Sequence, residues 1–218
     1  PLGSCKPEAP GLADGSAAPM RQIDFYLTAI SPWTYLAGSR PAEIAARHGA
    51  RLRYKPVDPS ALFQRTGGVA LADRHESRKA YRLQELRRQS KKMGLPLNPR
   101  PAFFPTNPAP AAYAIIAAQE AGGGDLDALV QSLLRACWVE ERNIAEDEVI
   151  TEALAAAGFP RSLAMSGMLT GAELYGRFLE EAVAAGVFGF PFFVVDGSEC
   201  FWGQDRLDDL DAYLAGEL

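Results

Sequence analysis

The alternation of apolar and polar positions near the start of the chain predicts two β-strands. In residues 21–28 the apolar side chains Ile23, Phe25 and Leu27 fall on one face, as in a strand that buries one side. Residues 51–58 alternate in the same way, with apolar positions set against charged ones. A crossover helix between two such strands makes a right-handed βαβ unit.

The segment between these strands carries strong signals for a helix. Ser31 is a favourable N-cap, and Pro32 suits the first helical position, where its missing N–H is not needed. We expect the helix to run towards Gly49, with a kink or break near Pro41.

After the second strand, apolar positions recur at helical spacing over a long stretch. Gly- and Pro-rich breaks divide this stretch into separate helices. The helices are expected over residues 76–94, 111–121, 125–141, 146–157 and 170–186. Residues 191–203 then return to strand patterning around an Asp196-Gly197 turn, which predicts a hairpin, and an amphipathic helix closes the chain.

The order of these elements is βαβ, a helical block and then α-β-β-α, which predicts an α/β thioredoxin-like fold with an inserted all-helical domain. Residues 20–58 and 166–218 are expected to form the thioredoxin-like domain, and residues 59–165 the insertion. Residues 1–19 are rich in Pro, Gly and Ala and lack the apolar core of a secretory signal. We interpret them as a flexible, tag-derived leader, with Met20 as the natural start.

Composition and charge narrow the classes of function. With 22% charged residues and a net charge of −5, the chain is not expected to bind nucleic acid or an anionic membrane. Cys5, Cys137 and Cys200 form no CxxC motif, which fits a reducing compartment and a cytoplasmic location. Cys137 and Cys200 are expected to be buried. His48 and His75 stand apart, so no metal site is expected.

The turn at Ser31 is the first candidate for chemistry. In thiol–disulfide enzymes of this fold the turn after the first strand carries two cysteines, and here the four positions read Ser-Pro-Trp-Thr. A serine hydroxyl without a neighbouring base is a poor nucleophile, but it can donate a hydrogen bond to a thiolate supplied by another molecule. The start of a helix also favours an anion and lowers a thiol pKa. The alternative is that Ser31 is only an N-cap.

Two stretches, "DFYLTAISPWTYLA" and "GVFGFPFFVVDGSECFWGQDRLDDL", resemble the 2-hydroxychromene-2-carboxylate isomerases and the related kappa-class glutathione transferases, in the DsbA-like branch of thioredoxin folds. The resemblance implies a homodimer with glutathione as cofactor. It also implies isomerisation of an aromatic carboxylate by reversible thiolate addition and rotation about a C=C bond. A kappa-like transferase or peroxidase and a non-catalytic thioredoxin-like binding module remain alternatives.

The resemblance also implies which residues bind glutathione. They are Ser31, also the catalytic residue, with Phe190, Pro191, Gln204, Asp205 and Arg78. Pro191 would be a cis-proline that leaves the backbone of Phe190 free for the cysteinyl unit. Gln204 and Asp205 would hold the γ-glutamyl end, and Arg78 the glycyl carboxylate. Gly68 stands where family members have asparagine, so that contact is absent.

A further group of residues is expected to bind the substrate. The residues assigned are Trp33, Lys55, Asn107 and Trp202. Three arginines, Arg65, Arg74 and Arg82, are further options for a substrate carboxylate. Phe104 and Phe190 would extend an aromatic wall for a flat ring.

Overall fold

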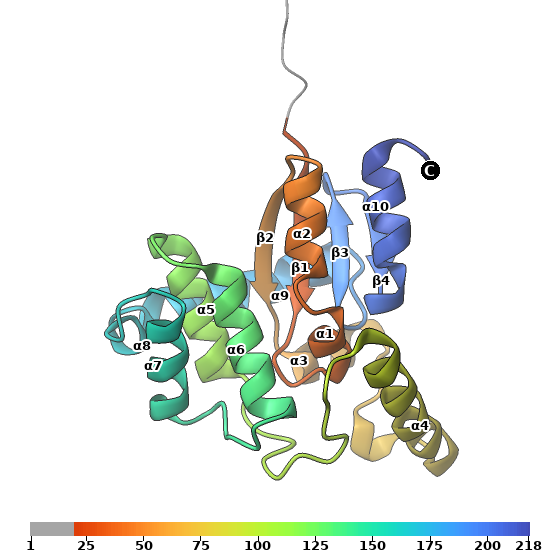
Figure 1. The fold of residues 1–218 in the computed structure, drawn as a ribbon, viewed down its shortest axis with the longest axis horizontal. Coiled ribbons are helices and arrows are strands. Elements are labelled where there is room, and N and C mark those ends of the chain that lie inside the picture. The colour runs from red at the N-terminus through yellow and green to blue at the C-terminus, as the bar shows by residue number, and fades with distance from the viewer. Residues whose placement is uncertain (1–19) are drawn as a thin grey trace, which may run out of the picture.

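The computed structural model describes residues 20–218 and contains one mixed four-stranded sheet (Figure 1). The strands are β1 (Gln22–Leu27), β2 (Arg51–Pro56), β3 (Phe192–Val195) and β4 (Glu199–Trp202), in the order β2-β1-β3-β4. β1 is parallel to β2, and β3 is antiparallel to both β1 and β4. The βαβ unit and the C-terminal hairpin are thus confirmed. The predicted leader and Cys5 lie outside the described residues.

The crossover between β1 and β2 consists of two short helices, α1 (Pro32–Ala37) and α2 (Arg40–Arg47). The predicted break is confirmed, but it lies at Gly38, where φ is +57°, a left-handed value that glycine adopts readily. Pro41 lies in the first turn of α2, where proline fits a helix without disrupting it.

The helices that follow surround the sheet unevenly. They are α3 (Pro59–Thr66), η1 (Leu71–Asp73), α4 (Glu76–Met93), α5 (Ala109–Ala121), α6 (Leu126–Trp138), α7 (Asp147–Ala156), α8 (Leu163–Ser166), α9 (Met168–Ala184), η2 (Gln204–Arg206) and α10 (Leu207–Ala215). All five helices predicted in the middle of the chain are present. In Figure 1, α5 to α8 lie together on one side of α1, while α4 lies on the other side. α4 packs against α1, where the sequence places the Ser31 turn.

Both faces of the sheet are buried, and the predicted alternation in β1 is confirmed. Ile23, Phe25 and Leu27 belong to a buried cluster that continues through α1 into α6 and α7. Tyr26, between them, belongs to a second cluster with residues of α9 and β3 on the opposite face. Residues 59–165, which we propose as an inserted domain, therefore share their core with the sheet. None of the helices between residues 20 and 218 has the length and apolar character needed to traverse a bilayer.

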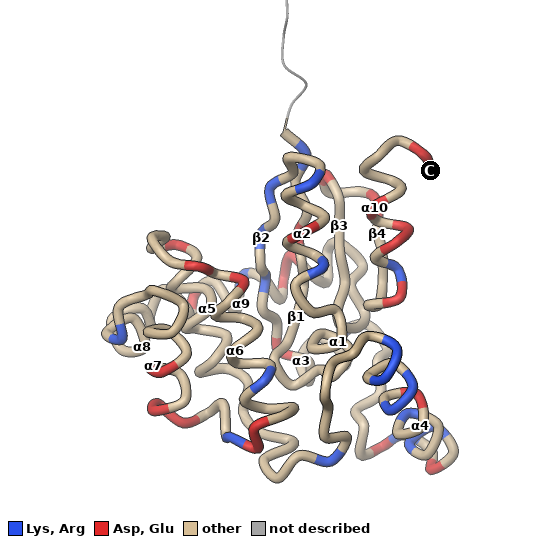
Figure 2. The backbone as a smooth tube through the Cα atoms, viewed as in Figure 1, with Lys and Arg blue, Asp and Glu red and all other residues tan. Residues whose placement is uncertain are grey.

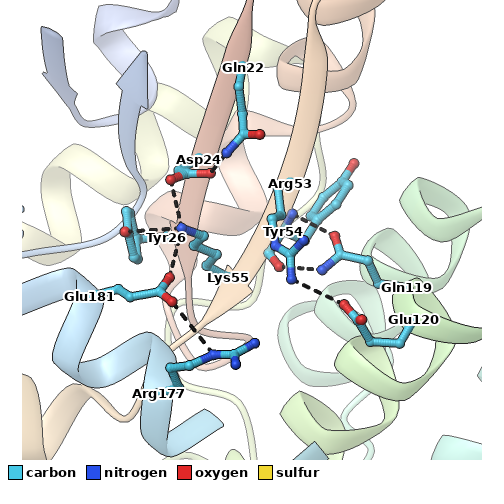
Figure 3. Close-up of polar contacts among 10 residues, drawn as sticks. All are labelled: Gln22, Asp24, Tyr26, Arg53, Tyr54, Lys55, Gln119, Glu120, Arg177 and Glu181. Atoms are coloured by element: carbon cyan, nitrogen blue, oxygen red, sulfur yellow. Dashed lines mark hydrogen bonds and ion pairs between the residues drawn. The ribbon is translucent and has the colours of Figure 1, made fainter. Parts of the chain in front are cut away.

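A polar network ties the edge strand β2 to α5 and α9 (Figure 3). The backbone N–H of Tyr54 donates to Oε1 of Gln119 at 2.8 Å, and Nε2 of Gln119 donates to the carbonyl of Tyr54 at 3.0 Å. The Gln119 side chain thus satisfies backbone groups that an edge strand would leave open. On the same strand, Nζ of Lys55 lies 2.6 Å from Asp24 and 2.9 Å from Glu181.

Candidate active site

Ser31 caps α1 and also reaches across the fold. Its Oγ accepts a hydrogen bond from the backbone N–H of Thr34 at 3.2 Å, as predicted for an N-cap. The hydroxyl donates to the carbonyl oxygen of Phe190 at 3.4 Å, a contact between residues 159 positions apart. Ser31 is 8% exposed, so few other partners are available to it. The serine is therefore both a cap and a link to the segment before β3.

The Phe190–Pro191 peptide bond is cis, which confirms the prediction for Pro191. The carbonyl of Pro191 accepts a hydrogen bond from the backbone N–H of Gly203 at 2.9 Å, so the segment after β4 lies beside the segment before β3. This arrangement brings Ser31, Phe190 and the residues that follow Gly203 together, although they come from opposite ends of the chain.

A cavity of about 710 Å³ opens between α1, α4 and the segment after β4. Its volume falls in the range of small-molecule sites. Six of the predicted site residues line it: Trp33, Arg78, Phe190, Trp202, Gln204 and Asp205. Ser31 and Pro191 do not line the cavity themselves. Ser31 is hydrogen-bonded to the lining residue Phe190, and Pro191 follows Phe190 in the chain.

The aromatic part of this wall depends on a glycine. Trp202 is 53% exposed and packs edge-on against Phe188, with ring centroids 4.9 Å apart. A Cβ at Gly189 would lie 2.5 Å from the indole nitrogen of Trp202, closer than such atoms approach. Gly189 therefore allows Trp202 to lie against the chain next to Phe190.

Charged residues of both signs line both sides of the cavity, with Arg206 beside Asp205 and Glu85 beside the arginines of α4. Asp205 lies on one side, after β4, and its carboxylate contacts the neighbouring Arg206 at 3.1 Å. Arg74, Arg78 and Arg82 lie on the other side, at or near the first turns of α4, which carries many basic residues (Figure 2). Burial and the charge of Arg74 lower the pKa of Arg82 to about 10. Burial and Arg78 lower the pKa of Arg74.

Two predicted substrate residues do not reach the cavity. Lys55 is 7% exposed and points from β2 towards α9, because strand alternation turns Tyr54 to the α1 side and Lys55 to the other. Its charge is already paired with Asp24 and Glu181 (Figure 3). Burial lowers the pKa of Lys55, but the hydrogen bonds with these two carboxylates outweigh it, and the pKa is raised overall. Both features make Lys55 part of the framework.

Asn107 is the second such residue. Its Oδ1 accepts a hydrogen bond from the backbone N–H of Ala109 at 3.0 Å, so it stabilises the start of α5. Arg65, an option for the substrate carboxylate, is paired with Glu180 and also lies away from the cavity. Phe104 packs against the buried Trp138, with ring centroids 5.1 Å apart, and does not extend the aromatic wall.

Gly68, at the position where the resemblance implies asparagine, packs closely against Phe63. A Cβ at this position would lie 2.4 Å from Cδ1 of Phe63. The Phe63 ring in turn lies 6.2 Å from the ring of Phe190, measured between centroids. The Phe63 ring, which contacts the cavity residue Phe190, therefore fills the space beside position 68.

The expectation for the cysteines is half right. Cys137 is buried on α6, and burial raises its pKa to about 12. Cys200 is exposed, so the prediction that it is buried was wrong. β4 is an edge strand in which Phe201 points inwards, and alternation therefore turns Cys200 outwards. Burial and the neighbouring Glu199 raise its pKa.

Sequence reasoning missed part of the α4 face of the cavity. The residues not assigned there are Ser77, Tyr81, Glu85 and Gln89. Together with Arg78 and Arg82 they recur every three or four residues, which is the spacing of one helix face. Starting from Arg78, that spacing is the signal in the sequence that indicates the remaining lining residues.

Comparisons with known proteins support the fold and identify the family. Residues 22–215 match the model of the DsbA-like thioredoxin domain. The 2-hydroxychromene-2-carboxylate isomerase of Sphingobium xenophagum is 31% identical over 204 residues, which cover 89% of this chain and 98% of that protein. The kappa 1 glutathione S-transferase of Caenorhabditis elegans is 27% identical over 200 residues, covering 85% and 87%.

A solved structure of a 2-hydroxychromene-2-carboxylate isomerase has the same fold, with a TM-score of 0.72 at 24% identity, covering 89% of this chain and 95% of that one. The chain therefore belongs to the family of DsbA-like thioredoxin domains and to that of the 2-hydroxychromene-2-carboxylate isomerases.

Proposed function

We propose that the protein is a glutathione-dependent isomerase of aromatic acids of the 2-hydroxychromene-2-carboxylate type. The observation that carries the proposal is the cavity that adjoins Ser31 and has Asp205 on one side and Arg78 on the other. Glutathione has an ammonium group at one end, a carboxylate at the other and a thiol between them. Asp205 and Arg78 supply one partner of opposite charge for each end of the molecule.

The residues that would hold glutathione lie in or beside the cavity. Asp205 would pair with the ammonium group. The amide of Gln204 would donate to the adjoining carboxylate, and Arg78 would pair with the glycyl carboxylate. The backbone of Phe190 would pair with the cysteinyl unit. When bound, glutathione supplies a thiolate that adds reversibly to a conjugated double bond and so permits rotation about it.

Ser31 stabilises the charge on the sulfur in this proposal. Its hydroxyl donates to the carbonyl of Phe190 at 3.4 Å, a long hydrogen bond that is easily exchanged for a shorter one to an anion. The capping bond from Thr34 fixes the oxygen while the proton turns. Trp33 and Trp202 would bind the flat ring of the substrate and exclude water from it.

A kappa-like glutathione transferase is the second candidate, and the kappa relative favours it. The same cavity would then bind glutathione, but the thiol would be consumed on an electrophile. We further propose a cytoplasmic homodimer, on the family resemblance and the cysteine pattern. A chain that binds no glutathione would instead be a thioredoxin-like binding module.

The experiment that tests the proposal follows isomerisation of 2-hydroxychromene-2-carboxylate by absorbance with a substoichiometric amount of glutathione. We expect many turnovers per glutathione and no net loss of thiol. Asp205→Asn should raise the glutathione concentration needed. Asp208→Asn is the matched control, because Asp208 lies on α10 and pairs with Arg40 outside the cavity.

Stoichiometric loss of thiol with 1-chloro-2,4-dinitrobenzene and no isomerisation would select the transferase. A melting temperature unchanged by millimolar glutathione would contradict both enzyme proposals, because a ligand that binds the native state must raise it.

A further inference from the structure

Arg82 is a half-buried cation that forms no ion pair with an acidic side chain of the described residues. Within residues 20–218, none of the ion pairs includes Arg74, Arg78 or Arg82, although Arg74 donates to the carbonyl of Val69 at 2.8 Å. A charge removed from water without a partner is costly to a folded protein. The neighbouring positive charges increase that cost. An anionic ligand would remove it.

Arg82 also lies where two cavities meet. Besides the main cavity, it lines a smaller one of about 240 Å³ whose other residues include Leu71, Pro101 and Phe104. Its guanidinium carbon lies 5.9 Å from the centre of the Phe104 ring. Arg78, by contrast, lines the main cavity and not the smaller one. The two arginines, one helical turn apart, therefore face different surroundings.

We propose that Arg82, with Arg74 beside it, binds the carboxylate of the aromatic substrate, separately from the glycyl carboxylate of glutathione assigned to Arg78. The choice of substrate rests on the proposed function. The chemistry that recognises it is a planar guanidinium with a carboxylate, next to aromatic side chains that take the ring. The site thus selects aromatic acids over their neutral analogues.

The test is a binding measurement without glutathione or turnover. Trp33 and Trp202 line the main cavity, so tryptophan fluorescence can follow titration with cinnamate and with the uncharged cinnamamide. We expect the natural chain to bind cinnamate about tenfold more tightly or better, as for a hydrogen bond between charged groups. Arg82→Gln should abolish this preference. Arg87→Gln is the control, because Arg87 is exposed on α4 and lines neither cavity.

A second measurement separates the two carboxylates. Arg82→Gln should change the dissociation constant for glutathione by no more than about twofold and should raise the KM for the chromene acid. Arg78→Gln should instead weaken the binding of glutathione. Equal binding of cinnamate and cinnamamide by the natural chain would overturn the inference. So would an Arg82→Gln variant that loses glutathione affinity and keeps the preference for cinnamate. A chain that prefers cinnamate through Arg82 but isomerises nothing would instead refute the proposed function alone.

Discussion

Replacing Ser31 by alanine tests the proposed chemistry most directly, because the structure assigns the side chain two separable effects. The first effect is on stability. The variant loses the capping bond from the Thr34 N–H, which should lower the free energy of unfolding by about 1 kcal/mol. Thr34 is buried, so water does not replace that bond easily.

The second effect is on bound glutathione. A hydrogen bond to a charged acceptor contributes about 1.5–3 kcal/mol, and one pKa unit corresponds to about 1.4 kcal/mol. Ser31→Ala should therefore raise the pKa of the bound thiol by about one to two units. The pKa is measured from the ultraviolet absorbance of the thiolate across a pH titration, and stability from urea unfolding.

Two controls separate these effects. Ser31→Thr keeps the hydroxyl and should retain most of the thiol effect. Ser39→Ala alters the N-cap residue of α2, whose side chain makes no capping bond, and should change neither quantity. If Ser31→Ala lowered stability but left the pKa of the bound thiol unchanged, Ser31 would be a cap and nothing more.

Three further predictions concern the framework and the cavity. Lys55→Met should lower the free energy of unfolding by about 2–4 kcal/mol in a urea titration, because it leaves the half-buried Asp24 without its cationic partner. The folded-state pKa of Lys55 is raised, so its contribution is complete below its ordinary pKa of 10.5 and is lost as the pH rises through the folded-state value; an unfolding midpoint that stays constant through strongly alkaline pH would contradict this. Gln119→Leu should cost about 1–3 kcal/mol and speed hydrogen exchange at the Tyr54 amide, which loses its acceptor. Arg82→Met should raise the melting temperature in calorimetry, because it removes a half-buried cation that has no acidic partner within residues 20–218 and keeps an apolar stem. A lower melting temperature would show that the fold stabilises Arg82.

The elements of the fold were predictable because their signals are local. The alternation of Ile23, Phe25 and Leu27, the Ser31-Pro32 start of α1 and the Asp196-Gly197 turn each depend on a few neighbouring residues. The helix break was predicted near Pro41, a few residues after its actual position at Gly38. A glycine can end one helix and a proline can begin the next, so the sequence is compatible with either position.

The candidate site was predictable where a motif carried it. Phe190, Pro191, Gln204 and Asp205 lie in one short stretch of the chain, and the structure brings that stretch to Ser31. Lys55, assigned as a charge facing the cleft from the second strand, and Asn107, assigned from the likeness of its loop to a family loop, do not line the cavity. A charged side chain on a strand can point to either face, and only its partners decide between a ligand and an ion pair.

Cys200 shows the same limit for burial. An apolar-looking strand residue is buried in the centre of a sheet and exposed at its edge, and the strand order that decides this is set by pairing between distant segments.

The sequence by itself determined the order of strands and helices, the capped turn at Ser31 and the absence of sulfur from that turn, because hydrophobic spacing and caps act over a few residues. Only the tertiary structure decided that α4 lies across the cavity from Asp205, that Phe63 fills the space beside Gly68, and that Arg82 forms no ion pair with an acidic side chain of residues 20–218. These features depend on which side chains from distant parts of the chain come into contact, and those contacts form only when the whole chain packs.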